Sequence, residues 1–122
     1  MLKHRQKAVR CIGNDPVSLN LRCSLLKEHG WNALSAGNGH EGVIRFGQES
    51  VDAVVIDLDD DGAEAALIAG ELKRLRPAVP LIIVVTDEKE LANGATQQAS
   101  RVVVKSQEVQ TLIQVLRKLQ PE

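Results

Sequence analysis

The fold is decided by residues 51–57, which read VDAVVID and are followed directly by the acidic segment LDDDG at residues 58–62. Residues 53–56 form an unbroken apolar run rich in β-branched side chains, which is typical of a strand buried on both faces of a parallel sheet. The run ends on Asp57, and ligands of open α/β sheets bind at the carboxyl ends of the strands. Asp57 is therefore the first candidate site residue. The alternative is that it belongs to a solvated acidic loop.

Strands and helices are predicted to alternate along the whole chain. The other predicted strands cover residues 8–12, 32–36, 81–85 and 101–104, and the predicted helices cover residues 16–28, 39–49, 63–75, 88–99 and 107–119. The strand at 32–36 is too polar to be central, so we expect it at an edge of the sheet. This fivefold alternation predicts a parallel sheet with helices on both faces and right-handed crossovers.

The composition of the chain limits the classes of protein to which it can belong. With 122 residues, 43% of them hydrophobic and 25% charged, the chain is expected to form one globular domain. A net charge of −1 gives no reason to expect nucleic acid or a membrane surface as a partner. No apolar segment suits a secretory signal or a membrane span. Cys11 and Cys23 are predicted to be buried thiols, which fits a cytoplasmic protein.

Polar side chains follow the predicted strands at the points where these strands end. Asn14 and Asp15 follow the first strand, Thr86 follows the fourth, and Lys105 follows the fifth. Asp15 is also a predicted N-cap of the first helix. Together with Asp57, these residues bring a carboxylate, a hydroxyl and an ammonium to one rim, which are the groups that phosphoryl transfer to a carboxylate requires.

On these residues the chain resembles the receiver domain of two-component response regulators. The resemblance lies in Asp57-Leu58 after the buried strand, Pro80 with Thr86, Val104-Lys105 before the last helix, the end of the first helix at residues 25–31, and Ala36 with Gly39. It covers residues 1–122 as a single receiver-like domain. The resemblance implies a (βα)5 flavodoxin-like three-layer sandwich, with a parallel five-stranded sheet in the order 2-1-3-4-5.

The resemblance also implies a function in phosphorelay signal transduction. Asp57 would accept a phosphoryl group from a histidine kinase or phosphotransfer protein, and Thr86 and Lys105 would contact that group. A downstream protein partner is expected as well. We expect no enzymatic activity beyond self-catalysed phosphoryl transfer to Asp57 and hydrolysis of the product.

The acidic pocket departs from the family pattern. Receivers usually carry two adjacent acids after the first strand to hold Mg²⁺, and these positions fall on Gly13 and Asn14 here. Mg²⁺ takes oxygen ligands in octahedral geometry, which Gly13 cannot supply from a side chain. The remaining candidate metal ligands are Asn14, Asp15, Asp57 and Asp59, where Asp15 would serve only after a one-residue slip. We therefore expect Mg²⁺ binding to be weak or absent.

The switch region departs from the pattern too. Val102 stands in place of the switch aromatic, Ser106 in place of a proline, and Asp87 where a small residue is usual. The stretch between Thr86 and Lys105 is also shorter than in typical receivers. These changes leave open a second function, that of a degenerate pseudo-receiver acting as a phosphorylation-independent protein-interaction module.

A nucleotide-binding enzyme is the third alternative. Residues 37–42 read GNGHEG and match the G-x-G-x-x-G fingerprint of dinucleotide-binding domains. The strand before this pattern is the polar edge strand, however, and the first strand lacks the phosphate-binding loop that such a protein needs. We therefore interpret the pattern as a glycine-rich turn at the start of a helix.

Overall fold

The computed structural model describes residues 6–58, 63–86 and 99–119. Its elements are β1 (Ala8–Gly13), α1 (Pro16–Glu28), β2 (Asn32–Ala36), α2 (Gly39–Gln48), β3 (Ala53–Asp57), α3 (Ala63–Leu75), β4 (Leu81–Val85), β5 (Arg101–Val104), the 3-10 turn η3 (Lys105–Gln107) and α4 (Glu108–Leu119). The helix expected at residues 88–99 falls almost entirely outside the described residues. None of the helices within this part of the chain is long and apolar enough to cross a membrane.

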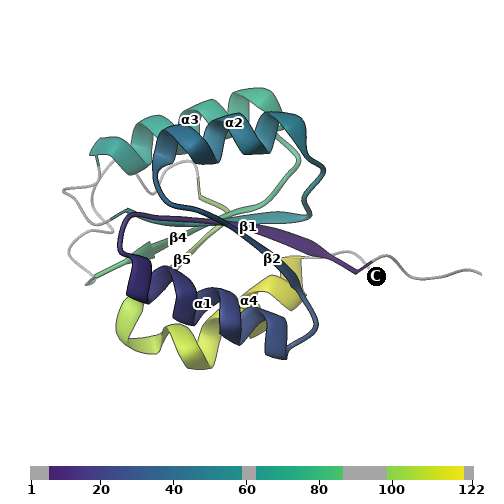
Figure 1. The fold of residues 1–122 in the computed structure, drawn as a ribbon, viewed down its shortest axis with the longest axis vertical. Coiled ribbons are helices and arrows are strands. Elements are labelled where there is room, and N and C mark those ends of the chain that lie inside the picture. The colour runs from purple at the N-terminus through teal and green to yellow at the C-terminus, as the bar shows by residue number, and fades with distance from the viewer. Residues whose placement is uncertain (1–5, 59–62, 87–98, 120–122) are drawn as a thin grey trace, which may run out of the picture.

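The strands form a single parallel sheet in the order β2-β1-β3-β4-β5. This order confirms the predicted topology, including the edge position of β2. Figure 1 shows the sheet as the middle of three layers, with α2 and α3 on one face and α1 and α4 on the other. The prediction of a three-layer (βα)5-type sandwich is therefore confirmed for the described elements.

The side chains of β3 alternate between the two layers of helices. Val54 and Ile56 pack with residues of α2 and α3, whereas Ala53 and Val55 pack with residues of α1 and α4. Because successive side chains of a strand point to opposite faces, Asp57 is directed to the side of α1 and α4. The same alternation buries all five residues of β3, as its apolar sequence predicted.

The ends of α1 follow the local signals of the sequence. The Asp15 side chain caps the first turn by accepting a hydrogen bond from the Val17 backbone N–H, and Pro16 occupies the first helical position. Gly30, just beyond the helix, has φ of 90°, a conformation that favours glycine. The predicted N-cap is confirmed. Cys23 on this helix and Cys11 in β1 are both buried, as predicted.

The glycines of the GNGHEG segment allow α2 to pack closely. A Cβ on Gly42 would lie 2.7 Å from Cγ1 of Ile12 in β1, and a Cβ on Gly39 would lie 2.7 Å from Cδ1 of Ile68 in α3. Asn38 caps the helix by accepting a hydrogen bond from the Glu41 N–H at 2.8 Å. The pattern therefore serves helix packing, in agreement with the sequence interpretation.

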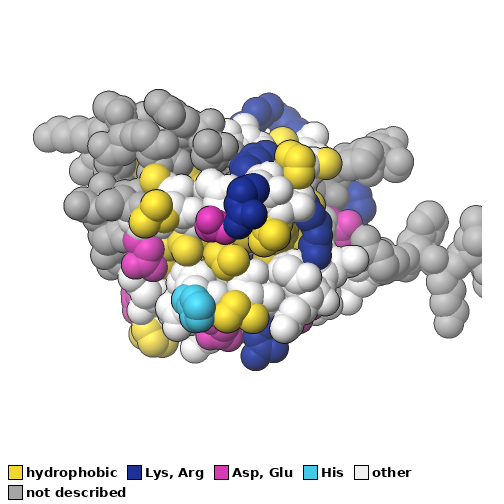
Figure 2. Space-filling view, turned by 90° about the horizontal axis from the view of Figure 1, so that it is seen from above, with side chains coloured by type: hydrophobic (Ala, Val, Ile, Leu, Met, Phe, Trp, Pro, Cys, Tyr) yellow, Lys and Arg dark blue, Asp and Glu magenta, His cyan; other side chains and the backbone are white. Residues whose placement is uncertain are grey.

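The outer face formed by α2 and α3 is the one seen in Figure 2. Hydrophobic side chains on this face are interspersed with charged ones. A hollow of about 550 Å³ is lined by Asn38, Gly39, His40, Val43, Glu64, Ile68 and Glu71. It lies on the opposite side of the sheet from the side chain of Asp57.

Candidate functional site

The carboxyl ends of the strands bring the predicted site residues to one rim. Gly13 pairs with Asp57 in the register of β1 and β3, Thr86 directly follows β4, and Lys105 directly follows β5. Because the sheet is parallel, these positions lie at the same edge. The predicted grouping of strand ends is therefore present, and its centre is the carboxylate of Asp57.

Asp57 is a buried carboxylate held by two cations. Its residue is 7% exposed. Nη2 of Arg22 donates a hydrogen bond to Oδ2 of Asp57 at 2.7 Å, and Nζ of Lys105 lies 3.2 Å from the same oxygen. The alternative of a solvated acidic loop is therefore wrong for Asp57. In the part of the chain that the structure describes, no hydrogen bond or ion pair reaches the other oxygen, Oδ1.

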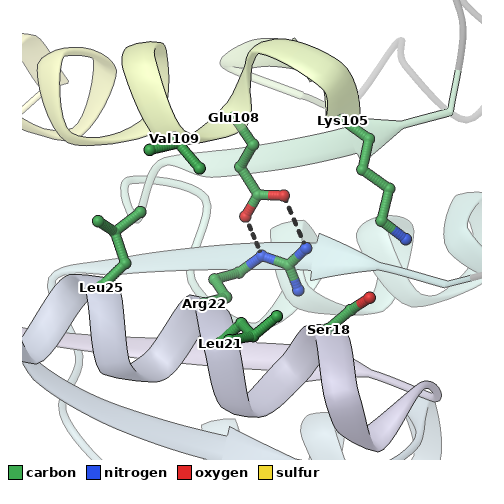
Figure 3. A pocket seen from close by; sticks show the side chains of 7 residues that line it. All are labelled: Ser18, Leu21, Arg22, Leu25, Lys105, Glu108 and Val109. Atoms are coloured by element: carbon green, nitrogen blue, oxygen red, sulfur yellow. Dashed lines mark hydrogen bonds and ion pairs between the residues drawn. The ribbon is translucent and has the colours of Figure 1, made fainter.

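Arg22 is the site residue that the sequence interpretation missed. It lies in the middle of α1, is 3% exposed, and pairs with Glu108 at the start of α4. Its Nη2 donates to Oε1 of Glu108 at 2.9 Å, and its Nε donates to Oε2. Figure 3 shows the two side chains reaching toward each other from the two helices. Arg22 therefore links two helices and Asp57 through one guanidinium.

A signal for Arg22 is present in the sequence. Leu19, Cys23 and Leu26 form the buried side of α1, and Arg22 falls among them at helical spacing. An arginine on a buried helix face requires carboxylate partners, because an unpaired buried charge is too costly. The pattern indicates that partners exist, but it does not indicate that one of them is Glu108, at the other end of the chain.

The electrostatics of the cluster keep Arg22 charged. Burial by itself would lower the pKa of Arg22, but the hydrogen bonds and charges of Glu108 and Asp57 outweigh burial and raise this pKa above its ordinary value. The guanidinium is thus a permanent cation. With the half-buried Lys105 it balances the two buried carboxylates, so the cluster brings two positive and two negative groups near one another.

The space beside Gly13 is where the guanidinium lies. A Cβ added to Gly13 would be 3.8 Å from Nη1 of Arg22 and 3.2 Å from the backbone oxygen of Asp57. Nη1 is buried and has no hydrogen-bond partner among the described residues. Gly13 therefore borders the guanidinium of Arg22, and a Cβ at this position would be in ordinary van der Waals contact with it.

The acidic residue next to this space has a structural role. Oδ1 of Asp15 accepts from the Val17 N–H at 3.3 Å, and its Oδ2 accepts from the Ser18 hydroxyl at 2.8 Å. The Ser18 hydrogen bond is the main cause that lowers the pKa of Asp15 below its ordinary value. Both oxygens of this carboxylate therefore cap α1.

The donors for a metal ion are few in the described part of the molecule. No group of three or more His, Cys, Asp or Glu side chains in residues 6–58, 63–86 and 99–119 could hold a metal ion. Asn14 is exposed, and Asp59 lies outside the described residues. Oδ2 of Asp57 is in contact with the guanidinium of Arg22 and the ammonium of Lys105, and both cations repel a divalent cation. The predicted ligands Asn14, Asp15, Asp57 and Asp59 stay a prediction.

The described residues of the switch region differ in their exposure. Thr86 and Ser106 are exposed, while Val102 is half-buried and packs with the cluster of α2 and α3. Asp87 lies outside the described residues. Val102 is thus part of the core, and it offers no aromatic ring at this position.

A groove of about 340 Å³ runs beside the cluster, between α1 and α4. It is lined by Ser18, Leu21, Arg22, Leu25, Lys105, Glu108 and Val109. Figure 3 shows Arg22 and Glu108 bridging the two helices, with Leu25 and Val109 on one side of the pair and Lys105 and Ser18 on the other. Leu21 and Val109 are large apolar residues with exposed fractions of 67% and 75%. The ion pair therefore forms part of the lining of an apolar groove.

Comparison with known proteins identifies similar sequences. No family model matches the chain. Over 82 residues it is 28% identical to the transcriptional regulatory protein GlrR of Escherichia coli K12. This alignment covers 67% of this chain and only 18% of GlrR. Over 109 residues it is 28% identical to protein PilH of Pseudomonas aeruginosa, and this alignment covers 86% of this chain and 90% of PilH.

Solved structures show the same fold. Response regulator TrrA of Thermotoga maritima, crystallised with Mg²⁺ and BeF, matches with a TM-score of 0.85 and 24% identity over 93% of this chain and 99% of that one. TrrA in complex with the histidine kinase ThkA matches with a TM-score of 0.84, 23% identity, and coverage of 94% and 99%. The chain therefore has the fold of response-regulator receiver domains and is similar to them in sequence, which confirms the resemblance that its motifs predicted.

Proposed function

We propose that this domain is a phosphorelay receiver in which Asp57 accepts a phosphoryl group from a phosphohistidine. The observation that supports this proposal is the different pairing of the two oxygens of the Asp57 carboxylate. Arg22 and Lys105 contact Oδ2, while Oδ1 makes no hydrogen bond or ion pair within the described residues. A carboxylate with one oxygen held and the other available has the arrangement that a nucleophile needs.

The proposed reaction transfers one phosphoryl group between two side chains. Oδ1 of Asp57 attacks phosphorus, a P–O bond forms, and the P–N bond to the donor histidine breaks. The departing imidazole nitrogen keeps the electron pair of that bond and takes up a proton. Lys105 and Thr86, at the ends of the neighbouring strands, would stabilise the equatorial oxygens of the phosphoryl group. Attack of water on the acylphosphate later releases phosphate.

The proposed partners follow from this chemistry. The donor is a histidine kinase or a phosphotransfer protein, and the complex of TrrA with ThkA supports this class of partner. A downstream protein would recognise the phosphorylated domain in the cytoplasm. The net charge of −1 gives no support for nucleic acid or a membrane as the direct partner.

The proposal includes weakened or absent metal binding. In TrrA the receiver is seen with Mg²⁺. Gly13 has no side-chain ligand, Asn14 offers only a neutral oxygen, and Asp15 uses both carboxylate oxygens to cap α1. These donors fit Mg²⁺ poorly, because its octahedral site near a phosphate calls for anionic oxygen ligands.

A second function is favoured by a specific observation. The ion pairs of Arg22 with Asp57 and Glu108 hold the site without a phosphoryl group, and Val102 supplies no aromatic switch. A domain locked in this way would act as a phosphorylation-independent protein-interaction module. This pseudo-receiver shares the fold and differs only in whether Asp57 reacts.

Intact-mass spectrometry distinguishes the two functions. The domain is incubated with acetyl phosphate and Mg²⁺, and the Asp57→Asn variant is treated in parallel as the matched control. A mass increase of one phosphoryl group in the wild type but not in the variant is the expected result. An unchanged mass in the wild type, under conditions that phosphorylate a reference receiver domain in parallel, would favour the pseudo-receiver.

A further inference from the structure

We propose that Arg22 is the built-in cation of the phosphoacceptor site and takes the place of a divalent metal ion. Glu108 is proposed as the residue that positions the guanidinium. This inference rests on the proposed function, since it concerns the same reaction at Asp57. It differs from that function by requiring that the reaction proceed without metal.

The first support is the direct contact between Arg22 and the nucleophile. Nη2 of Arg22 lies 2.7 Å from Oδ2 of Asp57, closer than Nζ of Lys105 at 3.2 Å. Both residues of the Arg22–Asp57 pair are buried. Water screens a buried charge pair weakly, so the guanidinium stabilises negative charge at Asp57 more effectively than an exposed cation does.

The second support is the space that the guanidinium occupies. Position 13 is a glycine, and its missing Cβ would lie 3.8 Å from Nη1 of Arg22. An aspartate there would place its carboxylate against the guanidinium and compete with Asp57 for it. Glycine at this position thus supplies no metal ligand and places no carboxylate beside the guanidinium.

The third support is the unused donor of Arg22. Nε and Nη2 are paired with the carboxylates, whereas Nη1 is buried and finds no acceptor among the described residues. A buried polar group without a partner is unfavourable, and such groups are few in native proteins. A phosphoryl oxygen on Asp57 is an acceptor of suitable charge for this N–H group, and arginine is well suited to contact two oxygens at once.

Glu108 explains why the guanidinium stays in this place. Its two oxygens accept from Nε and Nη2, which fixes the plane of the guanidinium. Glu108 is itself 9% exposed and begins α4. Within the described residues no hydrogen bond or ion pair joins Glu108 to Asp57, so its proposed role is to position Arg22 rather than to contact the reacting atoms.

The test compares phosphorylation with and without metal. The full chain is treated with acetyl phosphate in excess EDTA or in Mg²⁺, and the rate of phosphorylation is followed by intact mass. The expected result is the same rate in both conditions for the wild type. A wild-type reaction that stops in EDTA and returns with Mg²⁺ would overturn the inference while leaving the proposed function intact.

Variants identify Arg22 as the cation. Arg22→Met is expected to slow the metal-free reaction at least about tenfold, the rate equivalent of losing about 1.4 kcal/mol of transition-state stabilisation, and Arg22→Lys should restore part of the rate. Glu108→Gln should make the rate depend on Mg²⁺, because a loosened guanidinium competes less well with the metal. Glu71→Gln, which disrupts the exposed pair with Arg74, is the matched control and should change nothing. Unchanged metal-free rates in folded Arg22→Met would contradict the role of Arg22.

A direct titration keeps the inference testable if no phosphorylation occurs. Mg²⁺ is added to ¹⁵N-labelled wild-type protein, and the amide signals of Gly13 and Asp57 are followed by NMR. The inference predicts no saturable shift of these signals, even where the proposed function has failed. Saturable shifts at both positions in the wild type would show that a metal reaches Asp57 despite Arg22, and would overturn the inference without any variant having to fold.

Discussion

Replacing Arg22 by methionine should destabilise the fold, because the substitution leaves two buried carboxylates without their main cation. Asp57 and Glu108 have side chains that are only 9% and 11% exposed. Removing one partner of a buried ion pair typically costs about 3–5 kcal/mol. Lys105 still lies 3.2 Å from Asp57, so we expect a loss at the lower end, about 3 kcal/mol.

Glu108→Gln is expected to cost less than Arg22→Met. The glutamine oxygen can still accept one hydrogen bond from Arg22, and the guanidinium keeps its contact with Asp57. The lost charge-assisted hydrogen bond corresponds to about 1.5–3 kcal/mol. Because Arg22 and Glu108 contact each other, the double variant should be more stable than the sum of the two losses implies, by about 1–2 kcal/mol.

Urea denaturation followed by circular dichroism measures these losses. The comparison is valid if all variants show the same dependence of unfolding free energy on urea. Glu71→Gln in the exposed Arg74–Glu71 pair is the control, and an exposed pair of this kind contributes at most about 1 kcal/mol. If Arg22→Met and Glu71→Gln cost the same, the cluster around Asp57 does not form as described.

Three further perturbations test separate parts of the structure. Asp15→Ala should lower the melting temperature by removing the cap of α1. Asp15→Asn should retain most of the cap. Because the pKa of Asp15 is lowered in the folded state, the wild type should have a higher melting temperature than Asp15→Asn above pH 3.8, and this difference should disappear as the pH falls through the folded-state pKa. Thermal melts recorded at a series of pH values measure this difference. Gly42→Ala should cost about 1–3 kcal/mol in urea unfolding, because its Cβ would overlap Ile12. Gly47→Ala in the same helix meets nothing within 4 Å and should instead stabilise by up to about 1 kcal/mol, so equal effects of the two would refute the close approach of α2. Gly13→Asp combined with Asn14→Asp should tighten Mg²⁺ binding more than tenfold, about 1.4 kcal/mol, in a calorimetric titration, whereas equally tight binding by the wild type would show that other residues already form a metal site.

Much of the fold could be predicted because its signals are local. The apolar run of β3 predicted a strand buried on both faces, and all five residues of β3 are buried. The polar sequence at residues 32–36 predicted an edge strand, and β2 lies at the edge of the sheet. Asp15 was predicted to cap α1, and it does. Each of these features depends on residues close together in the chain.

The centre of the site could be predicted only in part. Asp57 and Lys105 were predicted to lie close together because parallel strands end at a common rim. In the structure Nζ of Lys105 lies 3.2 Å from Oδ2 of Asp57. Arg22 was missed because its partners come from β3 and α4, and pairing between distant side chains leaves no local pattern. A buried arginine among leucines was the available signal, since such a charge must have partners. Gly13 was interpreted only as a lost metal ligand, whereas in the structure this glycine also borders the guanidinium of Arg22.

A crystal structure of the protein grown in excess Mg²⁺ tests the central claim most directly. The claim is that the cation in contact with Oδ2 of Asp57 is the guanidinium of Arg22, held there by Glu108. The account predicts that electron density will show Nη2 of Arg22 within hydrogen-bonding distance of this oxygen, with no metal ion coordinated by Asp57. Octahedral density for Mg²⁺ on Asp57, with Arg22 displaced toward the groove, would contradict it.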